Sequence, residues 1–426
     1  MSDDHIVCLV ADRLIDGTGR DAIGNAAAVW QDDRLVSVGP RDQITIPRDA
    51  RVIEGDDLTI MPGLFDSHVH LGAQAGMNYP RLLMTPRSLQ LLYAVPNCAA
   101  TLAAGVTTIR DAGLTPAGVK LAVERDLFPG PRMQVAVSIL GQTGGHADDW
   151  MPCGAIVSLG SGVDIPDGVV DGIDGMRRRA REVLRAGGDW IKLCTSGGVL
   201  SASDDPTAAQ LTVDEIAVAV YEAAAVGKRC MAHAMSAQGI KNALHAGVVS
   251  IEHGVFLDEE AIELMKQKHA YLVPTLAAPL DVISRAKREP GTLPEAMLRK
   301  AISTTDQHRR SFKAAVEAGV TIAMGTDSGV GEHGQNAREL ALMVDAGITP
   351  MAAITASTLT AAHLLHLDKE LGSLEVGKVA DLIAVKGDPL NEIALFNDPG
   401  RVRLVIKGGK LVKDSLTSAV PAATIA

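Results

Sequence analysis

IMPGLFDSHVH, residues 60–70, is the stretch of sequence around which the fold is organised. After the break at Pro62-Gly63, the run that starts at Leu64 predicts a short buried strand. Side chains two apart on a strand point to the same face, so His68 and His70 project together, about 7 Å apart along the chain. They could hold one metal ion, although an isolated pair of this kind is more often two hydrogen-bonded core histidines. The rest of the chain decides between these interpretations.

Length and composition bound the class of protein. The chain has 426 residues, more than one hydrophobic core usually holds, so we expect one large domain and a smaller one. Hydrophobic residues make up 47% and aromatic residues 3%, with 42 glycines, which is typical of a parallel α/β protein with many tight turns. The formal charge of -11 argues against nucleic acid or an anionic membrane as a partner and favours small molecules.

Cysteine usage and the chain start predict a cytoplasmic protein. The cysteines are Cys8, Cys98, Cys153, Cys194 and Cys230. They are scattered without a C-x-x-C pair, so the sequence indicates neither a disulfide framework nor a cysteine zinc site. The first residues are acidic and have no long apolar run, and no other stretch approaches the length of a membrane span.

Residues 1–60 and 371–426 have the same texture. Short β-type runs alternate with Asp-Gly and Asp-Asp turns up to Ile60, and runs such as 380–385 and 402–406 repeat this pattern near the C-terminus. Because two chain ends of like kind enclose a different block, we expect them to pair into one small β-sandwich domain beside it.

Residues 61–370 alternate apolar runs with helical patterns, which indicates βα repeats and a parallel sheet. Eight strand runs can be counted, at residues 64–70, 106–110, 134–138, 189–194, 230–233, 250–253, 271–275 and 321–327. A (β/α)8 TIM-like barrel is the simplest closure of that count, and its chemistry belongs at the C-terminal ends of the strands. Segment 141–174 is much longer than a usual loop, which is typical of a lid or a substrate wall.

Helix boundaries are also readable within this block. Thr212 and Glu215 form a capping box that opens a helix up to Gly227. Thr349-Pro350 starts a last helix that runs to about Leu367.

Five strand ends of the expected barrel carry a residue that can bind metal or become a ligand. These residues are His68 and His70, then Lys192, His233, His253 and Asp327. Each has an ordinary alternative, such as a core hydrogen bond, a helix cap or an ion pair, but packing alone hardly places six of them at the same end of successive strands. Lys192 is unusual because it stands in an apolar strand, where a charged amine pays a large desolvation cost. A neutral lysine amine can react with CO₂ to give a carbamate, an anion able to bridge two cations.

With these motifs the chain resembles the amidohydrolase superfamily over nearly its whole length. The matching stretches are Pro62–Leu71, Gly105–Asp111, Ile191–Leu193, Ala232–Ala234, Ile251–Gly254, Gly325–Asp327 and Gly372–Leu382. Within the superfamily it is similar to the imidazolonepropionase-like branch, which includes Xaa-Pro dipeptidases and ochratoxin-cleaving amidohydrolases with a carboxylated lysine.

The resemblance implies two divalent metal ions, expected to be zinc. It assigns His68, His70 and Asp327 to the first ion, His233 and His253 to the second, and N6-carboxylated Lys192 to both. Imidazolonepropionase uses one metal and lacks this lysine, so Lys192 argues against that activity. Met235 stands where proline dipeptidases often have Tyr, which argues against strict proline specificity. The family also implies a homo-oligomer, with an octamer plausible.

Two divalent ions polarise a carbonyl and generate hydroxide near neutral pH. Asp327 could take the proton and pass it to the leaving amine. His146 in the long loop is placed to polarise the scissile carbonyl or to hold a substrate carboxylate. An exposed loop histidine without such a role is an equally good interpretation. His333, Ser196 and Gly197 are further candidates for substrate binding. His308, His363 and His366 lie in helical contexts and are expected not to be ligands, and Cys194 is expected to be core filler.

Three functional interpretations follow. The first is a binuclear zinc hydrolase that cleaves the amide bond before a C-terminal amino acid, in dipeptides or in N-acyl amino acids such as ochratoxin-type phenylalanine amides. The second is a lactonase or carbamate hydrolase on the same metal pair, because the nucleophile does not distinguish acyl groups. The third is an assembly protein without metals or enzymatic activity, against which the six retained ligands argue.

Overall fold

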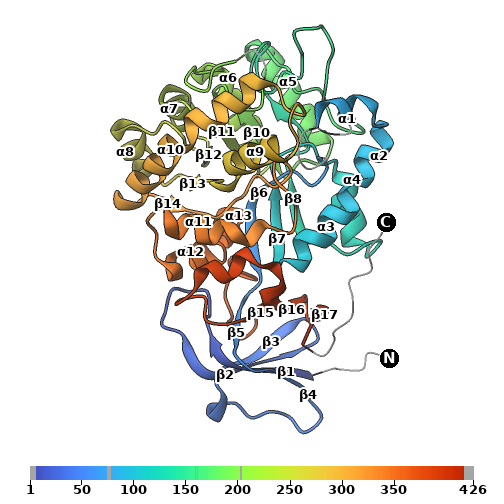
Figure 1. Ribbon diagram of the computed structural model, residues 1–426, viewed down its shortest axis with the longest axis vertical. Coiled ribbons are helices and arrows are strands. Elements are labelled where there is room, and N and C mark those ends of the chain that lie inside the picture. Colours follow the sequence, from blue (N-terminus) through green and yellow to red (C-terminus); the bar gives the residue numbers. More distant parts are fainter. Residues whose placement is uncertain (1–5, 74–77, 159, 161, 202–203, 417–426) are drawn as a thin grey trace.

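The computed structural model describes residues 6–73, 78–158, 160, 162–201 and 204–416 (Figure 1). Its strands are β1 (Ile6–Leu14), β2 (Ile23–Gln31), β3 (Arg34–Pro40), β4 (Arg51–Glu54), β5 (Leu58–Pro62), β6 (Leu64–Val69), β7 (Val106–Asp111), β8 (Arg132–Val135), β9 (Ile139–Leu140), β10 (Trp190–Cys194), β11 (Arg229–Ala234), β12 (Ser250–His253), β13 (Tyr271–Val273), β14 (Thr321–Ile322), β15 (Leu382–Lys386), β16 (Val402–Lys407) and β17 (Lys410–Asp414). Its α-helices are α1 (Tyr79–Met84), α2 (Arg87–Leu92), α3 (Ala94–Ala103), α4 (Ala117–Glu124), α5 (Gly172–Arg185), α6 (Val213–Ala224), α7 (Ala237–Ala246), α8 (Glu259–Gln267), α9 (Ala277–Arg288), α10 (Glu295–Glu317), α11 (Glu339–Asp345), α12 (Pro350–Ala356) and α13 (Leu359–Leu365).

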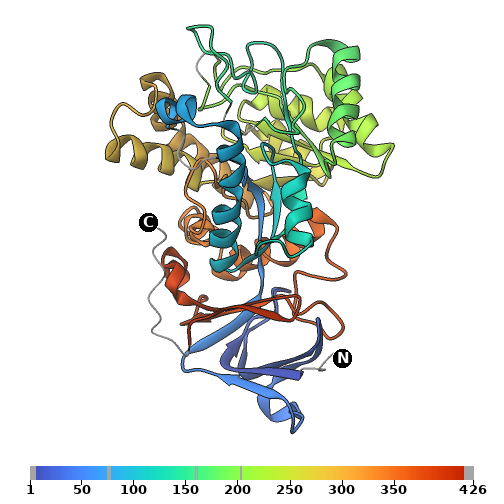
Figure 2. The same cartoon turned by 90° about the vertical axis from the view of Figure 1, so that its right-hand side faces the viewer.

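Strands from both ends of the chain share one sheet, with the order β17-β16-β15-β5-β1-β2-β3 and with β4 also paired to β1. The two ends meet in the antiparallel pair of β5 and β15, where Ile60 lies opposite Ala384. Figure 2 shows these blue and red strands together below the helices. The sheet curls over a shared core, which brings the Trp30 indole on β2 within 3.0 Å of the Gly409 carbonyl, to which it donates. A division of this sheet into the two layers of a sandwich stays a prediction.

The remaining strands form two parallel sheets, β6-β7-β8 and β14-β13-β12-β11-β10-β9. Backbone hydrogen bonds join one edge of each sheet, since Ser67 donates to the Met324 carbonyl (2.8 Å) and Asp327 donates to the His68 carbonyl (2.7 Å). At the other edge, β8 pairs with β7 and β9 pairs with β10. The chain bends between β8 and β9 at Val137, whose φ is 65°. The single strand expected over residues 134–138 is therefore two short pieces.

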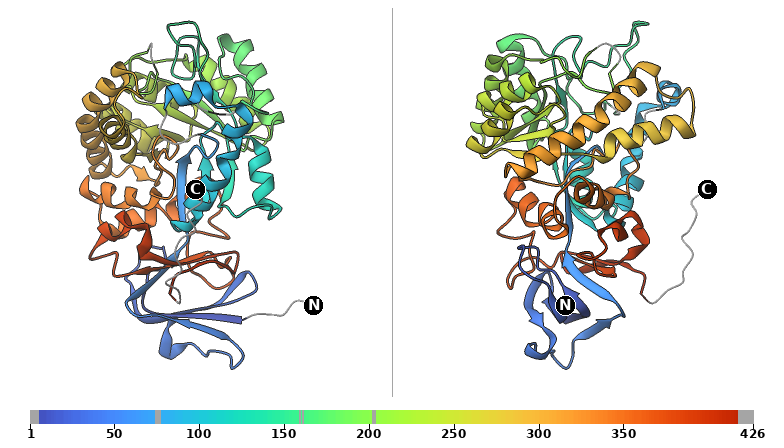
Figure 3. Two further views of the ribbon diagram at one scale, coloured as in Figure 1. Left: turned by 45° about the vertical axis from the view of Figure 1, so that its right-hand side comes forward. Right: turned by 60° about the vertical axis from the view of Figure 1, so that its left-hand side comes forward.

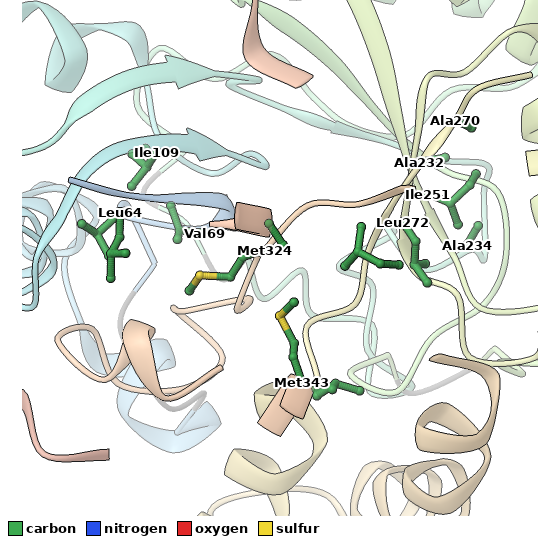
Figure 4. Close-up of a cluster of buried hydrophobic side chains, with 14 of the residues drawn as sticks. Leu64, Val69, Ile109, Ala232, Ala234, Ile251, Ala270, Leu272, Met324 and Met343 are labelled. Carbon is green, nitrogen blue, oxygen red and sulfur yellow. The ribbon is translucent and has the colours of Figure 1, made fainter. Parts of the chain in front are cut away.

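One hydrophobic core runs across both parallel sheets. Figure 4 shows Val69 and Ile109 from the three-stranded sheet on one side and Ile251 and Leu272 from the six-stranded sheet on the other. Met324, which follows β14, lies between the two groups. The shared core holds the strand ends of both sheets in fixed positions, which is what a multi-residue site requires.

The structure has helix starts at both positions where the sequence predicts them. Thr212 and Glu215 form the expected capping box at the start of α6, and the Thr349 side chain caps α12, which begins at Pro350. The expected final helix to Leu367 is instead two helices, α12 and α13, separated at Ser357 and Thr358. Figure 3 shows the long α10, which packs beside α9 along one side of the larger part of the molecule.

The long segment after β9 forms one wall of the site. Between Leu140 and Gly172 its described residues contain isolated bridges, Gly141 with Val169 and Trp150 with Ile156, rather than a regular element.

Among the described helices, none combines the length and the apolar character that a membrane span needs.

Candidate metal centre and active site

All six expected ligand residues line one cavity of about 360 Å³. Five of them lie on or directly after a parallel strand: His68 and His70 at β6, Lys192 on β10, His233 on β11 and His253 at the end of β12. The sixth, Asp327, lies in the segment after β14. His253 and Asp327 have positive φ values of 73° and 62°. All six are buried. Because parallel strands deliver their C-terminal ends to the same side, residues 259 positions apart meet here.

His68, His70 and Asp327 form a group that could hold a metal ion, with one ligand atom of each within 4.8 Å of the others. Asp327 Oδ1 lies 3.1 Å from His70 Nε2 and 3.5 Å from His68 Nε2. These contacts lack the alignment of a hydrogen bond, so in the described part of the chain Oδ1 is buried without a hydrogen-bond donor. A buried carboxylate oxygen in this state is costly, and a cation between the three groups satisfies it. The donor set therefore fits a metal ion.

The four histidines each commit one ring nitrogen to the protein and leave the other for a ligand. The committed contacts are His68 Nδ1 to Glu252 Oε2 (2.7 Å), His70 Nδ1 to Gly113 O (2.9 Å), His253 Nδ1 to Thr275 Oγ1 (2.7 Å) and His233 Nε2 to Gly197 O (3.1 Å). Such contacts fix the tautomer and the orientation of metal-binding imidazoles. Nε2 is thereby left for a metal on three of the rings, and Nδ1 on His233.

The second half of the site has two imidazoles and an amine. The ring centroids of His233 and His253 lie 4.7 Å apart, and that of His253 lies 5.1 Å from that of His68. Lys192 is 2% exposed, and among the described residues its amine has neither a hydrogen bond nor an ion pair. Burial lowers the pKa of Lys192. An amine that gives up its charge becomes a nucleophile for CO₂.

Burial also sets the charge of the other groups. It lowers the pKa of His68 to about 4, with the Lys192 charge adding to the effect, and it holds the pKa values of His233 and His253 well below their usual range. For Asp327 burial acts upward, but the neighbouring His68 and His70 outweigh it, and the net pKa lies well below its usual value. Neutral imidazoles and an ionised carboxylate are the forms that bind metal.

Sequence reasoning missed the residues behind His68. Glu252 on β12 accepts at 2.8 Å from Arg110 Nη2, and both side chains are fully buried. The Arg110 guanidinium also stacks on Trp190, 4.7 Å from the ring centroid. A signal was present, since an acid inside the apolar strand SIEH must be paired to be tolerated. Its partner could not be read from the sequence, because His68 is 184 positions away.

His146 reaches the site from the long segment after β9. Its ring stacks on that of His233, with centroids 4.1 Å apart and planes at 23°. A second, smaller cavity of about 70 Å³ adjoins the first. The residues that line both cavities are His146, Leu200, His233, His253, Asp327 and Val330. His146 therefore stands with the candidate ligands at the boundary between two spaces.

The structure places three other candidates differently. His333 contacts Thr101 Oγ1 through Nδ1 (3.1 Å) and the His70 carbonyl through Nε2 (3.3 Å), and it lines neither of the two cavities. Ser196 Oγ accepts from the Met235 amide at 2.7 Å, and the Gly197 amide donates to the Ala208 carbonyl at 3.0 Å. These polar groups already have partners within the protein.

Three histidines and one cysteine are not among the expected ligands, although His308 lines the smaller cavity and Cys194 the larger one. His308 is buried on α10 and contacts the His253 carbonyl through Nε2 at 3.0 Å, so it supports the end of β12. His363 and His366 belong to α13 and its end and do not line the cavities. Cys194 does line the larger cavity, but burial raises its pKa to about 12, which keeps it a thiol.

Comparison with known proteins identifies the class. Residues 59–412 match the amidohydrolase family, and the chain belongs to it. An ochratoxinase of Aspergillus niger is 33% identical, over 96% of this chain and 87% of that protein. A crystal structure of a Xaa-Pro dipeptidase with bound methionine in the active site has a TM-score of 0.87 at 33% identity, over 96% of this chain and 100% of that one.

A third relative is a prolidase complexed with N-methylphosphonate-L-proline, with a TM-score of 0.87 at 32% identity over 96% of this chain and all of that one. With the family, these relatives make the chain more particularly a hydrolase that acts on amide bonds. A small-molecule amide as substrate fits this class.

Proposed function

We propose that the chain is a binuclear metal-dependent amidohydrolase that cleaves the amide bond before a C-terminal amino acid, in dipeptides or N-acyl amino acids. The observation that carries the proposal is that three kinds of group meet at one cavity. They are four imidazoles with one ring nitrogen each bonded to the protein, and an Asp327 oxygen and a buried Lys192 amine that have no hydrogen-bond partner among the described residues.

His68, His70 and Asp327 would hold one ion, and His233 and His253 the other. Lys192, which is buried and lines the same cavity as the other five candidate ligands, would bridge both as its N6-carbamate. Zinc suits imidazole and carboxylate ligands. When bound, such a pair polarises a carbonyl and lowers the pKa of water.

Asp327 would take the proton of the attacking water on its carboxylate and pass it to the leaving nitrogen. It is buried beside both cavities, so the proton stays out of bulk solvent during the transfer. His146, which faces the same boundary, would contact the scissile amide and orient it.

The cavity walls and the relatives support the proposed substrate class. Ile139, Trp150, Met151 and Met297 contribute apolar surface to the larger cavity, and Met235 lines the smaller one. Apolar walls with a few convergent polar groups favour hydrophobic acyl and amino-acid side chains. Ochratoxin-type phenylalanine amides belong to this class.

A substrate screen tests the proposal. Purified protein should release amino acids from members of a dipeptide and N-acyl amino acid library, and chelation should abolish the release. Elemental analysis should find about two divalent ions per chain. A protein that is active on lactones or carbamates but on no amide of the library would overturn the substrate class while leaving the metal centre intact.

We further propose that the two parallel sheets close as one (β/α)8 barrel of residues 61–370, and that residues 1–60 and 371–426 form one composite β domain. Backbone hydrogen bonds between the two sheets support the closure, from Ser67 to Met324 at one edge and from Asp189 to Val135 at the other. A homo-oligomer is also proposed, because α1 and α2 expose large apolar side chains, namely Leu83, Met84, Leu89 and Leu92. The cytoplasmic location stays a prediction from the sequence.

A further inference from the structure

Two neighbours restrict the ring of His146. The ring stacks on that of His233. It also lies against Gly198, where an added Cβ would come within 2.3 Å of the His146 Cε1 atom. The ring can lie there only because Gly198 has no side chain. These contacts set the plane of the ring, and what is left to decide is which edge of the ring faces the cavity.

A buried network holds the Nδ1 edge of that ring. Nδ1 lies 2.9 Å from Ser201 Oγ and 3.6 Å from Asp204 Oδ2. Asp204 in turn accepts from Lys300 Nζ of α10 (3.0 Å), from the Gly198 amide (3.1 Å) and from Ser201 Oγ in a short contact. The Lys300 amine also donates to the carbonyls of Gly198 (3.1 Å) and Ser201 (3.0 Å).

Gln210 ties the same network to the long segment. Its Oε1 accepts from the His146 amide at 3.0 Å, and its Nε2 donates to Asp204 at 3.3 Å. Asp204 therefore joins three parts of the chain that are distant in sequence, around one ring. Its side chain is 3% exposed, so water competes little with these contacts.

The direction of the hydrogen bonds follows from the groups involved. Ser201 has one hydroxyl proton, and its other two close neighbours, Asp204 Oδ1 and the Gly198 carbonyl, only accept. Ser201 Oγ and Asp204 Oδ1 can lie in contact only with the hydroxyl proton between them, so Ser201 Oγ must accept from His146. This requires a proton on Nδ1 of His146. In the neutral ring, Nε2 then carries a lone pair, and in the described part of the chain it has no hydrogen-bond partner.

We propose that Ser201 and Asp204 are positioning residues that fix the proton of His146 on Nδ1, so that Nε2 accepts a hydrogen bond from the N–H of the scissile amide. The inference rests on the proposed function and deepens it. It replaces the donor role suggested by the sequence with an acceptor role. It also names a substrate class: secondary amides, which have this N–H, are favoured over Xaa-Pro bonds and esters, which lack it.

The first test compares an N-acyl amino acid with the ester of the same shape, in which oxygen replaces the N–H. Esters are intrinsically more reactive, so the measured quantity is the loss caused by each variant. His146→Ala should lower kcat/KM for the amide about tenfold more than for the ester, the worth of one hydrogen bond. Asp204→Asn and Ser201→Ala should show the same selective loss, and Asp306→Asn, an exposed residue of α10, should show none.

The second test reads the tautomer without turnover. In the purified protein with ¹⁵N-labelled histidine, the signal that disappears in His146→Ala should report a protonated Nδ1 and an unprotonated Nε2. Asp204→Asn, whose amide can donate, should shift this signal toward the other tautomer.

Equal losses for amide and ester in His146→Ala, or an Nε2–H tautomer in the wild type, would overturn the inference. The proposed function fails separately, if wild-type protein hydrolyses neither substrate. The tautomer measurement still decides the hydrogen-bond direction in that case.

Discussion

The two halves of the candidate metal centre are built differently. The half with His68, His70 and Asp327 has its carboxylate supplied by the chain. The half with His233 and His253 has Lys192 beside it, an amine that cannot bind a cation while protonated. The comparison teaches that the first half, the complete half, has a carboxylate among its candidate ligands as translated, whereas in the proposed centre the other half gains an anionic ligand only through carboxylation of Lys192.

The complete half is also locked by the backbone around it. Asp66 accepts from the amides of His68 and Thr326, both at 3.1 Å, and so bridges β6 to the segment after β14. Asn336 donates to the other oxygen of Asp66 at 2.8 Å. The position of Asp327 relative to His68 therefore does not depend on a metal.

The largest effect is expected for Asp327, the residue of the complete half that is proposed to transfer the proton. Asp327→Asn keeps an oxygen ligand but cannot accept a proton, so kcat should fall about a thousandfold while most of the metal is retained. Steady-state kinetics and elemental analysis of one preparation measure both. Asp306→Asn is the matched control. A loss of only a few-fold would assign the proton transfer to another group.

Lys192→Ala should separate the halves. Without the bridging carbamate the second half cannot hold its ion, so the metal content should fall from about two ions per chain to about one, with at least about a hundredfold loss of rate. Lys287→Ala, at an exposed position of α9, controls for the lost charge. Full metal content together with full rate would rule out the carbamate.

Glu252→Gln should weaken only the complete half. The glutamine side chain has one oxygen and one NH₂ group, so it cannot accept from both His68 and Arg110. Its NH₂ group would face a donor on one side. We expect about a tenfold weaker affinity for the first ion, measured by competition with a chelator, and a smaller change for the second. Glu263→Gln on the outside of α8 is the control. Equal weakening of both ions would show that the halves are coupled.

The smallest effect is expected for a substitution outside both halves of the metal centre, which should change stability but not metal binding. In the wild type, the Thr212 Oγ1 atom caps α6 by accepting from the Glu215 amide at 3.3 Å. Thr212→Ala removes this cap. The free energy of unfolding should fall by about 1 kcal/mol, as measured by denaturant unfolding. Metal content and rate should not change, and a loss of metal would mean that α6 supports the site.

Sequence reasoning succeeded where the signal is local. The capping box of Thr212 and Glu215 spans four positions and was found with its partners correct. Placement of Lys192 and His233 followed from counting strands, because the C-terminal ends of parallel strands meet whatever the loops between them do.

Long-range partners were beyond the same reasoning. Nothing near Glu252 in the sequence points to His68, and a bend at Val137 with positive φ is unexpected for a β-branched residue. His333 was expected to bind substrate because it follows Asp327 closely in the sequence. The loop instead turns it behind His70, since a few backbone dihedrals decide on which side of a strand a loop residue lies.

The pairing of β5 with β15 has a consequence for the newly made chain. Strand β5 lies between β1 and β15, so its second neighbour does not exist until Leu382 has been translated. At common synthesis rates this takes roughly 15 to 60 s after β5. During that time an apolar strand edge is open to other chains. Chains stalled before Leu382 should thus be cleaved by protease within β1–β5, and release of the last strands should make this region resistant.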